Sequence, residues 1–134
     1  MTGKFYESQY EEALINLLQG QGWTYTHGSK IHRKNREIIL QEDLTAYLTR
    51  RYAELTAEDT ENIINRLRHV TGQTHFETLR NTYYLVRDGF RYVRHSDNKA
   101  FDIDFLDFCG TDNIFRAVNQ CTILILVDRF GCYP

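Results

Sequence analysis

The first hydrophobic pattern along the chain has the period of an α-helix. Ser8 and Glu11 have the spacing of a capping box, in which each side chain bonds the backbone N–H of the other residue. Gly20 and Gly22 supply residues suited to ending a helix. The sequence therefore predicts a helix over about Gln9–Gln19. Its apolar positions form one stripe expected to be buried, made of Tyr10, Ala13, Leu14, Leu17 and Leu18.

Helical spacing returns three times in the next part of the chain. One helix is predicted from Gln41, a second after Thr56, and a third after Thr74, which forms a capping box with Glu77 and whose helix ends at Gly89. The apolar positions expected to be buried are, in order, Leu44, Tyr47, Leu48 and Tyr52; Ile63, Ile64, Leu67 and Val70; and Phe76, Leu79, Tyr83 and Val86.

After Gly89 the hydrophobic period changes from about 3.6 to 2, which indicates strands. Apolar and polar residues alternate over Phe90–His95 and over Phe101–Leu106. Ser96–Lys99 between them has the composition of a turn, so a β-hairpin is predicted. Phe115–Val127 is rich in β-branched residues and predicts a further long strand, or a strand with a bend.

The remaining segments complete an α+β fold of about four helices and several strands. Trp23–Tyr25 predicts a short extended segment, and the basic, glycine-containing stretch His27–Arg36 predicts a loop. A length of 134 residues with 42% hydrophobic and 25% charged residues is typical of one globular domain. We therefore expect residues 1–134 to form a single domain.

Composition excludes several classes of protein. Cys121–Val127 is too short to span a bilayer and the N-terminus is too polar for a signal peptide, so a cytoplasmic protein is expected. Cys109, Cys121 and Cys132 fit neither a disulfide framework nor a zinc site; we expect free thiols, with Cys121 in the core. A net charge of -2 removes any whole-protein argument for nucleic-acid binding.

Most catalytic motifs are absent from the sequence. It has no phosphate-binding glycine loop, no G-x-S-x-G elbow and no pair of histidines on one helix face. Four aspartates, Asp102, Asp104, Asp107 and Asp112, are close enough in sequence to hold Mg²⁺ through oxygen ligands. The plain alternative, which spacing favours, is a solvated hairpin face with turn aspartates.

Two local basic runs are candidates for following a DNA backbone. The plain alternative is solvated surface. Their members are Lys30, Arg33, Lys34 and Arg36, and Arg87, Arg91 and Arg94.

Four blocks of sequence point to a known family. They are Glu7–Ile15 with Leu18 and Gly22–Tyr25; Arg36–Leu40 with Glu42–Leu44; Asn81–Leu85 with Asp88–Phe90; and Asp107–Phe108 with Asn113–Gln120. In this order and at about this spacing they resemble the N-terminal part of the restriction (R, or HsdR) subunit of type I restriction-modification enzymes. The last block resembles the family's Asp-Phe followed by Asn-x-Phe-x-x-x-Asn-Gln on the first core strand of its nuclease domain.

The resemblance implies a nuclease of the PD-(D/E)xK type, here with an incomplete sheet. In that fold an Asp and a Glu-x-Lys bind Mg²⁺ and position the attacking water. In the family these residues follow the Asn-Gln strand, whereas here Asp128 lacks a preceding Arg-Pro and no Glu or Lys follows Lys99. We therefore expect an N-terminal fragment that is inactive alone and needs no cofactor. The parent would be an ATP- and Mg²⁺-dependent endonuclease acting on unmodified DNA, with methylation and specificity subunits as partners.

Site residues follow from the resemblance residue by residue. Glu11 and Glu7 are accessory catalytic candidates, because nucleases of this fold often aim a first-helix carboxylate at the metal site, although capping alone explains Glu11. Gln120 and Asn113 are candidates through the motif match, and no metal ligand is assigned.

The rival hypothesis is a self-contained, non-enzymatic DNA-binding or adaptor domain. It would contact phosphates through local basic residues, namely Arg33, Lys34, Arg91 and Arg94.

Overall fold

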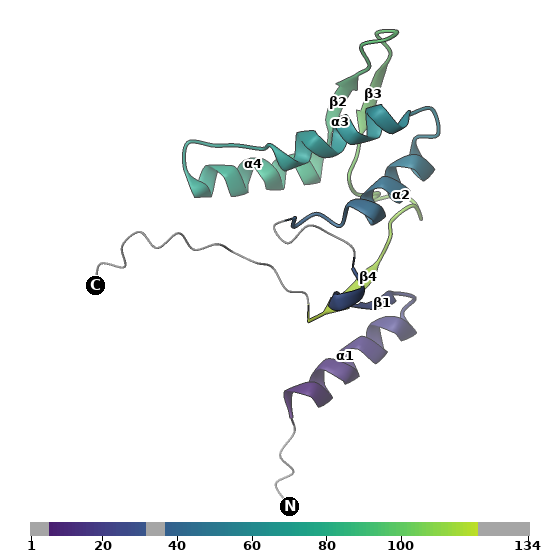
Figure 1. Ribbon diagram of the computed structural model, residues 1–134, viewed down its shortest axis with the longest axis vertical. Helices are drawn as coiled ribbons and strands as arrows, with labels where there is room; N and C mark the ends of the chain where they lie inside the picture. Colours follow the sequence, from purple (N-terminus) through teal and green to yellow (C-terminus); the bar gives the residue numbers. More distant parts are fainter. Residues whose placement is uncertain (1–5, 32–36, 121–134) are drawn as a thin grey trace, which may run out of the picture. The chain divides into compact units, whose positions relative to one another are not determined.

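The computed structural model describes residues 6–31 and 37–120 of the chain, and its residues group into two compact units (Figure 1). Among the described residues, the first unit consists of 6–31, 37–38 and 115–120, and the second unit of 39–114. Four α-helices and several short strands confirm the α+β class. The expectation of a single domain over residues 1–134 stays a prediction.

The first unit places helix α1 (Glu7–Gly20) against two short parallel strands, β1 (Thr24–His27) and β4 (Arg116–Asn119). Strand β1 confirms the predicted extended segment. The stretch predicted as a loop begins inside β1, at His27, and continues into a 3₁₀ turn at Gly28–Lys30. Residues 32–36 lie outside the described part of the chain.

Helix α1 begins two residues earlier than predicted, so the expected capping box between Ser8 and Glu11 is wrong. Tyr6 is the residue before the first helical position, and its backbone N–H donates to Oε1 of Gln9 at 3.1 Å. Gln9 thus performs the reciprocal role that Glu11 was expected to have. The Glu11 carboxylate is therefore not part of the capping box.

The apolar stripe of α1 is not buried as predicted. Leu14 is 56% exposed, and Tyr10 and Leu17 are exposed as well. The helix turns a different side towards β1 and β4, because Glu11, Ile15 and Leu18 are the half-buried positions. Hydrophobic spacing identified the helix correctly but not the face that packs within this unit.

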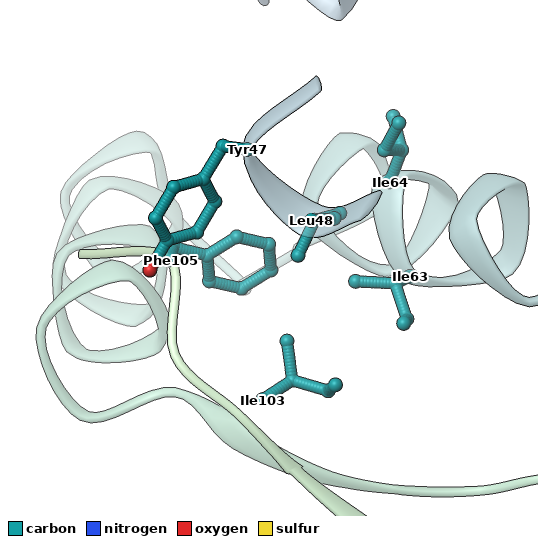
Figure 2. Packing of buried hydrophobic residues seen from close by; sticks show 6 residues of the cluster. All are labelled: Tyr47, Leu48, Ile63, Ile64, Ile103 and Phe105. Atoms are coloured by element: carbon teal, nitrogen blue, oxygen red, sulfur yellow. The ribbon is translucent and has the colours of Figure 1, made fainter. Parts of the chain in front are cut away.

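The second unit contains the hydrophobic core. It comprises α2 (Gln41–Arg51), α3 (Ala57–Arg68), α4 (His75–Asp88), β2 (Phe90–Val93) and β3 (Ala100–Ile103). Figure 2 shows how side chains from α2, α3 and the chain around β3 point towards one another. The cluster is made of Tyr47, Leu48, Ile63, Ile64, Ile103 and Phe105.

Both helix starts predicted after a threonine in this unit carry a side-chain cap. The Thr56 hydroxyl accepts from the Asp59 N–H at 3.2 Å, while the Asp59 carboxylate accepts from the Thr56 N–H at 2.9 Å. The Thr74 hydroxyl accepts from the Glu77 N–H at 3.1 Å, but the Glu77 carboxylate accepts from the Gln73 N–H, so the predicted capping box is only half formed. These bonds satisfy N–H groups that have no partner within the helix.

The predicted buried stripe of α4 is wrong. Phe76 is 70% exposed, and Leu79 and Tyr83 are similarly open. Leu85 instead packs against the core cluster, so α4 contacts the unit through a side offset from its most apolar one.

The predicted β-hairpin is confirmed. Strands β2 and β3 pair antiparallel with Phe90 opposite Ile103. Gly89 at the entry has φ of 69°, and a Cβ there would lie 2.0 Å from the backbone oxygen of Ile103. Only glycine permits this conformation at such close approach.

Strand β4 covers only part of the long strand predicted for Phe115–Val127. Phe115 directly precedes β4 and Gln120 directly follows it, while residues 121–127, including Cys121, lie outside the described part. Cys132 lies outside it too, and Cys109 is a free, exposed thiol. Over the described ranges no helix is both long and apolar enough to cross a membrane.

Candidate functional site

Two of the predicted site residues meet in the first unit. Glu11 lies in the middle of α1, and Gln120 follows the last residue of β4. Nε2 of Gln120 donates to Oε1 of Glu11 over 3.5 Å, the long end of hydrogen-bonding distance. This contact joins residues that are 109 positions apart in the sequence.

Gln120 adopts a backbone conformation that is uncommon for its residue type. Its φ is 52°, in the left-handed region, which residues other than Gly, Asn and Asp rarely adopt. Such a conformation costs roughly 1–3 kcal/mol and persists where surrounding contacts hold it. Strain of this kind is concentrated at functional sites, which makes the end of β4 a candidate site.

A pocket of about 330 Å³ lies beside this contact, between α1 and the two strands. Tyr25 of β1 and Asn119 of β4 line its strand side, and the Tyr25 hydroxyl donates to Oδ1 of Asn119 at 2.8 Å. The helix side is lined by Ser8, Glu11, Glu12, Ile15, Asn16 and Gln19. The pocket therefore offers carboxylate and amide oxygens but no positively charged side chain among its lining residues.

Oxygen ligands are what Mg²⁺ prefers, but a complete site needs several of them. Within residues 6–31 and 37–120, no group of three His, Cys, Asp or Glu side chains is placed to hold a metal ion. The described residues do not by themselves form a complete Mg²⁺ site. Glu11 and Glu12 are the carboxylates among the residues that line the pocket.

The other two catalytic candidates lie elsewhere. Glu7 is exposed, one helical turn before Glu11, and does not line the pocket. Asn113 belongs to the second unit, where its side chain bonds Asp107 twice. Its Oδ1 accepts from the Asp107 N–H at 2.8 Å and its Nδ2 donates to the Asp107 carbonyl at 2.6 Å. The visible role of Asn113 is to close the loop between these residues.

The predicted aspartate cluster is organised around Arg51 of α2. The Arg51 guanidinium lies 3.2 Å from Asp107, 3.4 Å from Asp112 and 3.5 Å from Asp104. Asp102 is exposed on β3, as expected of a solvated hairpin face, but Asp107 is buried. The simple picture of a solvated face is therefore wrong for Asp107.

Asp107 is held as a carboxylate by its surroundings. Backbone N–H groups of Asp112, Cys109 and Gly110 donate to its two oxygens. The Asp112 N–H in particular lowers the pKa of Asp107, and the other amides and Arg51 act in the same direction. The Asp107 carboxylate is thus part of the structure of the loop between Asp107 and Asn113.

The basic candidates differ from one another. Arg94 is mostly buried and bonded to Asp59 and Asp97, so its charge is already paired. Arg91 is exposed on β2, while Arg33 and Lys34 lie outside the described residues. Arg87 pairs with Asp88 and lies over the Tyr84 ring, with its guanidinium carbon 4.9 Å from the ring centroid. Of the described basic candidates, Lys30, Arg87 and Arg91 are exposed to solvent, whereas Arg94 is not.

Sequence reasoning missed three residues that organise these sites. Tyr25 and Asn119 line the pocket, and Arg51 gathers the aspartates. Tyr25 and Asn119 stand within the blocks of sequence that carry the resemblance, so those blocks were the available signal. No spacing rule pointed to Arg51, because its partners are more than 50 residues away.

The four helices and short strands place the chain among α+β proteins, with a first helix packed against two parallel strands. A family model described as "Type I restriction enzyme R protein N terminus (HSDR_N)" matches residues 4–130. The chain belongs to this family. Searches of curated proteins and of solved structures gave no match.

Proposed function

We propose that this chain is the N-terminal part of an ATP- and Mg²⁺-dependent DNA endonuclease, and that Glu11 serves its nuclease site. The observation that carries the proposal is the approach of Gln120 to Glu11, because it joins the first helix to the strand that resembles the family's core strand. Membership in the family of type I restriction R proteins supports the same activity.

In this proposal, the principal Asp and Glu-x-Lys come from chain beyond Gln120 in the parent protein. When bound, Mg²⁺ would activate water and stabilise charge on the scissile phosphate. Glu11 would supply a carboxylate at the edge of that centre, and the Gln120 amide would hold the carboxylate in one orientation. The Asn119 amide and the Tyr25 phenol would fill the strand side of the pocket.

The parent would act on unmodified foreign DNA in the cytoplasm, assembled with methylation and specificity subunits. Family membership supports this setting. We also propose that residues 1–134 alone do not cleave DNA, since no Glu or Lys follows Lys99 to provide a Glu-x-Lys.

The decisive experiment is Glu11→Ala in the full-length R subunit assembled with its partners. Cleavage of unmodified plasmid should fall by a factor of roughly 100 or more, because losing a carboxylate at a metal-dependent centre weakens transition-state stabilisation. ATP hydrolysis should be unchanged. The matched control is Glu7→Ala, one turn earlier and outside the pocket, which should cleave normally. Normal cleavage by Glu11→Ala would overturn the proposal.

A second experiment concerns the short chain. Residues 1–134 should show no Mg²⁺-dependent nicking of plasmid DNA, with or without ATP. Metal-dependent nicking that co-purifies with the folded chain and disappears in Glu11→Ala would show that the principal catalytic groups lie within it.

A further inference from the structure

The Tyr25 hydroxyl connects the two parallel strands of the first unit just before the chain turns out of β4. Tyr25 is paired with Ala117 in the register of the two strands, and Asn119 lies two residues further on, hence on the same face. The hydroxyl spans this diagonal and donates to Oδ1 of Asn119 at 2.8 Å. Asn119 is therefore fixed at the last position of β4.

The next residue, Gln120, has its backbone in the left-handed region at φ of 52°. A residue with a long side chain does not favour this conformation by itself, so neighbouring contacts must hold it. Two contacts flank it in the described structure: the Tyr25–Asn119 hydrogen bond immediately before it, and the approach of its own amide to Glu11.

The left-handed turn also decides where the Gln120 side chain goes. Residues that follow a strand in extended conformation alternate between its two faces, so continued extension would send the side chain of residue 120 to the face opposite Asn119. The change in φ releases the chain from that alternation. The Gln120 amide reaches Glu11 on α1, the helix that lines the same pocket as Asn119.

We propose that Tyr25 and Asn119 are positioning residues: their hydrogen bond holds Gln120 in the left-handed conformation that sets its amide against the Glu11 carboxylate. The inference rests on the proposed function, since it assigns Tyr25 and Asn119 to the site that Glu11 serves. Both act through Gln120, and neither needs to touch DNA.

The pair offers a clean double-mutant cycle. Tyr25→Phe removes the donor and keeps the ring in the pocket wall, whereas Asn119→Ala removes the acceptor. In the assembled full-length R subunit, each variant should lower the rate of plasmid cleavage about 10- to 100-fold through misplacement of Glu11. The double variant should cleave no more slowly than the worse single variant, because both remove one interaction. ATP hydrolysis should match that of the wild type.

A spectroscopic measurement on residues 1–134 separates positioning from general destabilisation. In ¹H–¹⁵N spectra of Tyr25→Phe, the chemical shifts of the backbone and side-chain amides of Gln120 should move. They should approach the values of an extended residue whose side chain makes no hydrogen bond. Resonances of the core residues Leu48 and Ile63 in the other unit should stay in place. The control for loss of a tyrosine hydroxyl is Tyr84→Phe on α4, which should leave both cleavage and the Gln120 signals unchanged.

The outcomes distinguish this inference from the function on which it rests. Loss of cleavage in Glu11→Ala combined with normal cleavage in Tyr25→Phe and Asn119→Ala would overturn the positioning role alone. Normal cleavage in Glu11→Ala would overturn both proposals. Additive losses in the double variant would also overturn the positioning role, and so would unmoved Gln120 signals. If one single variant folds poorly, the other removes the same bond and decides the matter.

Discussion

Arg94 and Asp59 form a buried ion pair, with Nη1 of Arg94 3.2 Å from Oδ2 of Asp59. The Asp59 residue is only 3% exposed and the Arg94 side chain 16% exposed. The same arginine makes two hydrogen bonds to Asp97, so it ties the hairpin to the start of α3. A residue that resembled a DNA contact in the sequence thus has a structural role in this unit.

Replacing Arg94 should therefore destabilise the fold. Arg94→Ala leaves the Asp59 carboxylate buried without its cation and should lower the free energy of unfolding by about 3 kcal/mol. Urea denaturation followed by circular dichroism measures this. Arg91→Ala, on the same strand region but exposed, is the matched control and should change stability by less than about 0.5 kcal/mol. Equal, small effects of the two substitutions would show that the ion pair contributes nothing.

Acid should destabilise the second unit, because several of its aspartates have lowered pKa values. Hydrogen bonds from Arg94 lower the pKa of Asp97 to about 2. Burial opposes ionisation of Asp59, but bonds from the Thr56 N–H and the Tyr92 hydroxyl outweigh it and lower its pKa as well. In the unfolded chain an Asp titrates near about 3.9. Between these values the unfolded chain binds more protons, so falling pH favours unfolding.

We therefore expect stability to be constant above about pH 5 and to decline as the pH falls towards 2. Urea midpoints measured at pH 6, 4 and 3 test this. Asp97→Asn should make the decline shallower, because one carboxylate with a lowered pKa is gone. A decline in stability as steep as that of the wild type would mean that Asp97 does not contribute to the pH dependence.

Two leucines on different helices test where the core lies. Leu48 on α2 is 0% exposed within the core cluster, whereas Leu14 on α1 is more than half exposed. Leu48→Ala should cost about 2–5 kcal/mol through lost burial and the cavity it leaves. Leu14→Ala should cost less than about 1 kcal/mol. Thermal unfolding of both variants supplies the comparison, and a large loss for Leu14→Ala would show that its stripe is covered.

The outcome for these helices shows what sequence patterns determine. Local signals were sufficient to place helices and hairpin: Thr56 with Asp59 and Thr74 with Glu77 form caps because the interaction is made within one turn. The spacing also gave the packing face of α2 and α3, whose predicted positions Tyr47, Leu48, Ile63 and Ile64 form the core. In α1 and α4 it did not, because partners distant in sequence decide which face packs. The apolar stripes around Leu14 and Phe76 therefore identified two helices correctly, but the prediction that these stripes are buried was wrong.

The candidate site, too, was only partly predictable from the sequence. Family-like blocks pointed to Glu11 and Gln120, and the fold brings this pair together. They did not reveal that Asn113 braces a loop. Asn113 and its partner Asp107 stand in the same block, and membership of a block does not distinguish a structural role from a catalytic one. Only the hydrogen-bonding pattern does so.

Asn113 accordingly gives a prediction that separates these two roles. Its side chain makes both a donated and an accepted bond to the backbone of Asp107, whose carboxylate is itself held by backbone amides and by Arg51. Asn113→Ala would leave the Asp107 N–H and carbonyl without these partners, and each lost bond contributes about 1 kcal/mol. We expect the free energy of unfolding to fall by about 2 kcal/mol, with Asn113→Asp recovering part of the loss by keeping the acceptor for the Asp107 N–H. Plasmid cleavage by the assembled full-length subunit, measured well below the melting temperature, should be unchanged in both variants. A cleavage defect in Asn113→Ala without loss of stability would return Asn113 to the nuclease site.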